Sequence, residues 1–137
     1  MKRIAIAAAL LCGLATSAQA TLYSCSVKGQ GVGASWIPEV VMIAVESEER
    51  VIVSDTIGAV LNGEPVQGAL LNDSNKAFSV AWTVGGLNDS RNQGVKMRYT
   101  AILNKGNNSI RLSGKPLGYA NQPFVGRGAC RVGEIPR

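Results

Sequence analysis

The residues that most often carry out chemistry in proteins form no recognisable catalytic set in this sequence. The chain of 137 residues contains no histidine, which excludes Ser-His-Asp triads and histidine-ligated metal sites. Asp55 and Asp89 are the only carboxylates that we expect to share a rim, and no other residue supports a glycosidase. No Ser-x-x-Lys sequence is present to pair a serine nucleophile with a lysine base. We therefore expect a protein that is not an enzyme and that uses no metal or cofactor.

A glycine-rich segment, Gly29-x-Gly31-x-Gly33, is the one possible nucleotide motif. A phosphate-binding loop needs a helix start directly after it, so that backbone N–H groups point at the anion. Trp36-Ile37-Pro38 and a predicted strand follow instead. These glycines therefore indicate a tight loop rather than a nucleotide site.

The first 20 residues have the features of a secretory signal peptide. Lys2 and Arg3 provide a basic start, an apolar run covers 4–14, and Ala18-Gln19-Ala20 has small residues where a signal peptidase cuts. The apolar run is shorter than the roughly 20 residues of a membrane-spanning helix. We expect 21–137 to be a single domain that is periplasmic or secreted and has no transmembrane segment.

Two cysteines, Cys25 and Cys130, remain after the predicted leader is removed. Two thiols in an exported chain usually pair with each other. Neither lies in a Cys-x-x-Cys sequence, which would favour a redox or metal role. We predict a structural disulfide that places the first and last strands side by side.

Alternation of apolar and polar residues with a period of two is the dominant pattern after the leader. Val95, Met97 and Tyr99 alternate with Lys96 and Arg98, as in a strand with one buried face. No segment shows helical periodicity over three turns. Eight strands are predicted, at 22–28, 39–45, 50–54, 65–71, 76–84, 95–103, 108–113 and 124–132.

The links between these strands alternate between tight and long. Tight links are predicted at 46–49, 72–75 and 104–107. The last two, Asn72-Asp73-Ser74-Asn75 and Asn104-Lys105-Gly106-Asn107, have the residue types of hairpin turns. The long links are 29–38, 55–64, 85–94 and 114–123. Successive links of an up-and-down meander fall at opposite ends, so the four long links would gather at one rim. We predict a small antiparallel up-and-down β-barrel of about eight strands, and a β-sandwich is the alternative.

Loops held by a rigid scaffold are where binding residues are expected, so the long-loop rim is the predicted binding site. Trp36 and Tyr119 would supply shape complementarity, or alternatively they plug the barrel mouth as part of the core. Polar anchoring would come from four residues: Asp89, Arg91, Lys115 and Asn121. Room inside the barrel would favour a small ligand, whereas a filled interior would favour a protein partner.

Five basic residues occupy outward positions of the predicted strands: Lys96, Arg98, Arg111, Arg127 and Arg131. The formal net charge of the chain is +5. If the strands are neighbours, these residues form a basic stripe that could meet an anionic surface, and a simply solvated polar face is the alternative. Nucleic acid is not an expected partner, because stacking aromatic residues are not interleaved with the cations.

Several short motifs resemble those of small exported proteins of Gram-negative bacteria. They are Tyr23-Ser24-Cys25, Trp36-Ile37-Pro38, Trp82, Gly118-Tyr119-Ala120-Asn121 and Arg127-Gly128-Ala129-Cys130. This group implies export but no particular activity. The Tyr-x-Cys start is also similar to that of periplasmic membrane-bound C-type lysozyme inhibitors, which are small disulfide-bonded barrels. Their Ser-x-Ser-Gly-x-Arg-Tyr loop has no match in this sequence, so no functional residue is carried over.

These observations favour an exported, non-enzymatic binding protein. Its rim would hold a small ligand or a protein partner such as a cell-wall hydrolase. The alternative is an envelope structural protein that contacts anionic surfaces through the basic wall of the barrel.

Overall fold

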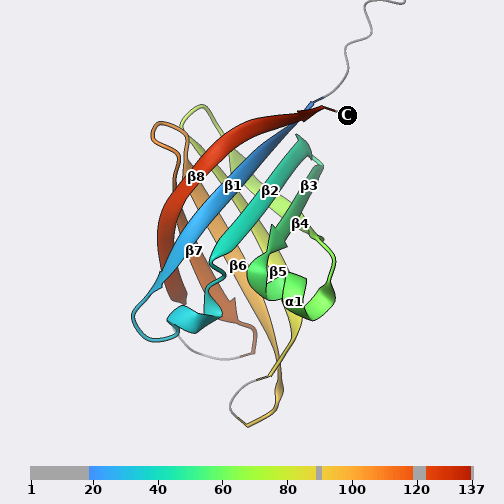
Figure 1. The fold of residues 1–137 in the computed structure, drawn as a ribbon, viewed down its shortest axis with the longest axis vertical. Coiled ribbons are helices and arrows are strands. Elements are labelled where there is room, and N and C mark those ends of the chain that lie inside the picture. The colour runs from blue at the N-terminus through green and yellow to red at the C-terminus, as the bar shows by residue number, and fades with distance from the viewer. Residues whose placement is uncertain (1–18, 89–90, 119–122, 137) are drawn as a thin grey trace, which may run out of the picture.

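A closed β-barrel is the architecture of the computed structural model, which describes residues 19–88, 91–118 and 123–136. Each strand pairs antiparallel with the next in sequence, and β1 pairs with β8 to complete the ring (Figure 1). The strands are β1 (Gln19–Gln30), β2 (Val40–Ser47), β3 (Arg50–Asp55), β4 (Val66–Asp73), β5 (Ala77–Asn88), β6 (Gly94–Asn104), β7 (Ser109–Pro116) and β8 (Phe124–Pro136). The predicted barrel is confirmed, and the sandwich alternative is wrong.

The strands are mostly longer than the alternating pattern predicts, and β5 and β6 show why. Alternation stops at Val84, because two glycines follow it in the sequence. Pairing resumes after a bulge, with Leu87 opposite Val95, since a bulge lets a strand continue past an irregular residue. The predicted ten-residue link at 85–94 is therefore reduced to 89–93.

The links are segregated between the two ends of the barrel. The tight turns at 48–49, 74–76 and 105–108 lie at the end where β1 begins and β8 finishes, and the long links lie at the opposite end (Figure 1). Side-chain oxygens hold two of the turns: Ser74 Oγ accepts from the Ala77 N–H, and Asn104 Oδ1 accepts from the Gly106 N–H. The predicted loop-rich rim is thus present, and it is the lower end of the barrel in Figure 1.

Two short helices in the rim links were not predicted. They are the 3-10 helix η2 (Ala34–Trp36) and the helix α1 (Thr56–Asn62). Neither reaches the three turns over which helical periodicity becomes visible in a sequence. Within the described residues, no helix has the length and apolar character needed to cross a bilayer.

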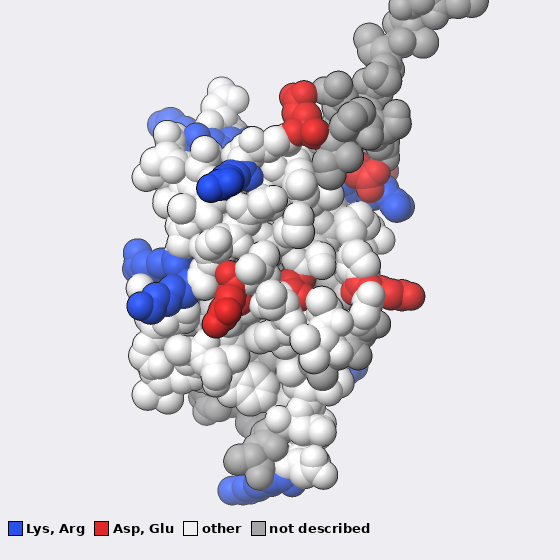
Figure 2. Space-filling view, viewed as in Figure 1, with Lys and Arg blue, Asp and Glu red and all other residues white. Residues whose placement is uncertain are grey.

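Outward-facing side chains of the strands include charged, small polar and apolar residues. On the face shown in Figure 2, charged side chains are scattered among uncharged ones. The segment 40–45 is apolar on both faces, as its sequence indicates. Its outward residues Val40 and Met42 stay 42% and 40% exposed, so no loop of the described chain covers them. The outer wall over β2 therefore includes exposed apolar side chains.

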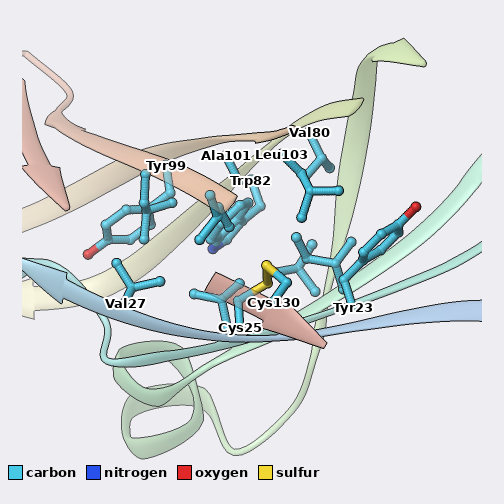
Figure 3. Close-up of a cluster of buried hydrophobic side chains, with 14 of the residues drawn as sticks. Tyr23, Cys25, Val27, Val80, Trp82, Tyr99, Ala101, Leu103 and Cys130 are labelled. Carbon is cyan, nitrogen blue, oxygen red and sulfur yellow. A yellow bond between two sulfur atoms is a disulfide. The ribbon is translucent and has the colours of Figure 1, made fainter. Parts of the chain in front are cut away.

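Inward-facing side chains fill the barrel. The largest fully buried ones are Trp82, Tyr99, Phe78, Ile43 and Met97, and the rings of Trp82 and Tyr99 pack with centroids 5.6 Å apart. Gly114 lies opposite Tyr99, and its missing side chain makes room for that ring, since a Cβ there would lie 2.8 Å from Tyr99 Cε1. Side chains from facing strands meet in the middle of the barrel (Figure 3).

The predicted disulfide closes the ring of strands. Cys25 and Cys130 lie directly opposite each other on β1 and β8, with their Cα atoms 4.0 Å apart and their sulfurs bonded (Figure 3). The two strands pair continuously from Gln19–Pro136 to Gln30–Val125. The bond therefore fixes the seam at which the two ends of the sequence meet.

Candidate functional site: the long-loop rim

Asp55 anchors the helix α1 to the barrel. It ends β3 with an extended backbone, and its Oδ1 caps the helix by accepting from the Gly58 N–H at 2.6 Å. Its Oδ2 accepts from Trp82 Nε1 at 2.8 Å, and the residue is only 4% exposed. Gly63 ends the helix in the left-handed conformation. Asp55 therefore has a structural role, and it is not free for acid–base chemistry.

The helix η2 is held over the barrel mouth by Trp36. The carbonyl oxygen of Trp36 accepts from the Tyr99 hydroxyl at 2.7 Å, and its indole stacks on Phe124 with centroids 6.4 Å apart. Gly33 begins the helix with a φ of 83°, and the Phe124 ring occupies the space that a Cβ would need. Trp36 is thus half-buried and packed against the core, and its part in binding stays a prediction.

A direct hydrogen bond joins these two rim segments. The Glu39 N–H, in the link after η2, donates to Thr56 Oγ1 at the start of α1, at 3.0 Å. Both segments also rest on neighbouring buried aromatic residues, Trp82 and Tyr99. The described rim is therefore a preorganised surface fastened to the core.

The environment of Tyr99 makes a pH-dependent prediction. Burial, and secondly the nearby charge of Asp55, hold the pKa of Tyr99 well above its usual value of 10.0. The unfolded chain releases this proton near pH 10, whereas the folded protein retains it. Tyr99 therefore stabilises the fold fully below pH 10 and loses that contribution as the pH rises, by about 1.4 kcal/mol per pH unit.

Urea denaturation at successive pH values above 9 measures this loss, with Tyr99→Phe as the comparison. The phenylalanine variant should lose about 0.5–1.5 kcal/mol at neutral pH, because the Trp36 carbonyl loses its donor. Its stability should then fall less steeply with pH than that of the wild type. Equal slopes for the two proteins would contradict the assignment.

Two valines at this rim are the most exposed large apolar side chains of the described protein. Val32, next to η2, is 94% exposed, and Val60, on α1, is 85% exposed. A groove of about 680 Å³ runs between the two segments and is lined by Ala34, Ile37, Pro38, Thr56 and Ile57 among others. Val32 was not predicted as a site residue, although its sequence context, an apolar residue between Gly31 and Gly33 in a predicted loop, is a signal for an exposed apolar side chain.

The structure describes two of the four predicted polar anchors, Arg91 and Lys115. The other two, Asp89 and Asn121, and the predicted aromatic anchor Tyr119 lie outside the described residues. Arg91 belongs to the link between β5 and β6, whose hairpin extends beyond the other loops in Figure 1. Lys115 lies on β7 opposite Arg98 of β6, so it belongs to the wall of the barrel rather than to the rim.

The five predicted basic wall residues are all exposed on three consecutive strands. Lys96 and Arg98 are on β6, Arg111 is on β7, and Arg127 and Arg131 are on β8. Arg111 lies directly opposite Arg127, and Lys28 of β1 lies on the other side of Arg127. Lys28 was not predicted as a member, although the predicted disulfide places β1 beside β8; the register of that pair shows that Lys28 lies opposite Arg127.

The described residues contain no group of three Cys, Asp or Glu side chains that could hold a metal ion. Three grooves of these residues lie on the outside of the barrel, over the rim, the outer wall and the tight turns. The interior is occupied by buried side chains. The geometry thus favours recognition on an outer surface over enclosure of a ligand in a cup.

Comparisons with protein-family models, curated proteins and solved structures found no match for this chain.

Proposed function

We propose that this protein is an exported, non-enzymatic binding protein that uses the long-loop rim to hold a protein partner, such as a cell-wall hydrolase. The observation that carries the proposal is that Val32 and Val60, 94% and 85% exposed, belong to the two rim segments that border a groove. Exposed apolar side chains that gather around a groove mark protein-interaction sites, whereas apolar residues scattered singly over a surface do not.

The rigidity of the rim supports the same proposal. Asp55 and Tyr99 fasten α1 and η2 to buried groups, so little conformational entropy remains to be lost when a partner binds. A filled interior argues against the small-ligand form of the hypothesis. Export to the periplasm or beyond is supported by the leader-like first 20 residues and by the disulfide.

A double substitution, Val32→Asp with Val60→Asp, tests the rim directly. Binding of purified peptidoglycan hydrolases from the same envelope would be measured by biolayer interferometry. At least one hydrolase should bind the wild type, and the variant should bind it about tenfold or more weakly, because two apolar contacts become charged.

The matched control is Met42→Asp with Leu71→Asp. These residues are 40% and 54% exposed and lie on β2 and β4. The control makes the same chemical change at two exposed apolar positions outside the rim. Equal weakening by both pairs, or no binding by the wild type across the hydrolase panel, would reject the proposal.

A further inference from the structure

Charged side chains are divided unequally around the barrel. The half formed by β6, β7, β8 and β1 carries eight basic residues: Lys28, Lys96, Arg98, Lys105, Arg111, Lys115, Arg127 and Arg131. Glu134 is the only acid on that half within 19–30, 94–118 and 123–136. Residues 39–88 instead carry seven acids: Glu39, Glu46, Glu48, Glu49, Asp55, Glu64 and Asp73. In Figure 2 blue side chains accordingly predominate along the left edge, beside β7 and β8.

A row of three cations lies at the centre of the basic half. Lys28, Arg127 and Arg111 are directly opposed on β1, β8 and β7, and none of them pairs with an acid in the described part of the chain. Like charges directly opposite on neighbouring strands are destabilising. An unrelieved repulsion of this kind is a cost that a bound anion would remove.

Arg111 and Arg127 also line the groove that lies over the tight turns. This groove, of about 620 Å³, includes Lys76 from the β4–β5 turn and Asn104 from the end of β6. Its Lys105 is already paired with Asp73. The groove therefore offers two adjacent guanidinium groups and one ammonium group without an acidic partner among the described residues.

We propose that this groove binds a phosphate group through Arg111 and Arg127. A guanidinium group binds phosphate oxygens in a bidentate manner. A phosphate monoester or pyrophosphate presents at least three terminal oxygens and about two or more negative charges to such a pair, whereas a carboxylate presents two oxygens and one charge. The phosphate could come from a soluble phosphorylated molecule or from a lipid headgroup, and the same residues would recognise either. The site is on the wall and the turns, so it is independent of the rim.

Two probes distinguish the sources. The first is pyrophosphate, whose binding is measured by isothermal titration calorimetry at about 0.15 M ionic strength, where the Debye length is about 8 Å. Glucuronate is the carboxylate comparison. The second is cosedimentation with vesicles of equal parts phosphatidylcholine and phosphatidylglycerol, compared with phosphatidylcholine alone. Binding of pyrophosphate indicates a soluble source, and binding to anionic vesicles alone indicates a lipid source.

The deciding variant is Arg111→Gln with Arg127→Gln. It should weaken binding of the effective probe by about tenfold or more, because each guanidinium contributes charge-assisted hydrogen bonds. Its thermal midpoint should be equal to or above that of the wild type, since a like-charge contact is removed. A loss of binding therefore cannot be attributed to unfolding.

The matched control is Arg98→Gln with Lys115→Gln, an opposed pair of cations on β6 and β7. It removes the same charge and the same type of repulsion, but neither residue lines the groove. Binding within about twofold of the wild type is expected for this control. Equal losses in both variants, absence of binding to both phosphate probes, or equal affinity for glucuronate would overturn the proposal.

Discussion

Replacement of both Cys25 and Cys130 with alanine should lower the free energy of unfolding by about 3–5 kcal/mol. The bond spans 105 positions of sequence, and closing a loop of that length restricts the unfolded chain by about 4–5 kcal/mol in the chain-entropy relation. The bond also joins β1 to β8, the seam that closes the barrel. Urea denaturation under oxidising conditions measures the change.

Reduction of the wild type separates the effect of breaking the disulfide from the effect of removing the two buried sulfur atoms. A reducing agent cleaves the bond but leaves both side chains in place, and it should reproduce most of the destabilisation. The reducing agent should have no effect on the alanine variant. A variant within 1 kcal/mol of the oxidised wild type would show that strand pairing alone holds the seam.

Replacement of Asp55 with alanine should cost about 2–4 kcal/mol. The substitution removes a helix cap, which contributes about 0.5–2 kcal/mol, and leaves the buried Trp82 indole N–H without an acceptor, which costs about 1–3 kcal/mol. Because Asp55 and Trp82 together hold α1 on the barrel, the loss of structure should begin in α1. Hydrogen exchange of the Gly58 amide should accelerate by more than that of amides in β6.

Asp73→Ala is the matched control for Asp55. Its carboxylate is exposed and pairs with Lys105 at the tight-turn end, and exposed ion pairs contribute about 0–1 kcal/mol. Asp55→Asn should fall between the two, since its amide oxygen can still accept one of the two hydrogen bonds. Equal stability of the two alanine variants would remove Asp55 from its proposed role as the anchor of α1.

The Asp55 variant also tests whether the rim must be rigid to bind. If preorganisation supports the partner contact, Asp55→Ala should weaken hydrolase binding although Val32 and Val60 are unchanged. Phosphate binding at Arg111 and Arg127 should be unaffected, because that groove lies at the tight-turn end of the barrel, opposite the rim. The two proposals can therefore fail separately.

Local patterns determined most of the architecture. Period-two alternation indicated strands such as β5, β6 and β7, since a strand with one buried face imposes it residue by residue, and a continuous apolar run indicated β2. Hairpin residues such as Asn104 and Gly106 marked the tight turns, and the alternation of link lengths predicted which end would carry the loops. The Cys25–Cys130 bond followed from the number of cysteines and the predicted export.

Only the tertiary structure decided what the candidate surfaces contain. In the sequence Asp55 is an acid in a predicted loop, and its hydrogen-bond partner Trp82 is 27 positions away. The contact that anchors the cap of α1 to the barrel therefore forms only when the chain folds. Closure placed Lys28 beside Arg127, although they are near opposite ends of the chain. Alternation reports which face of a strand is buried. Which residues of different strands come into contact depends on how the sheet closes, and the closed barrel brings together the residues that hold the rim helices and the row of three cations.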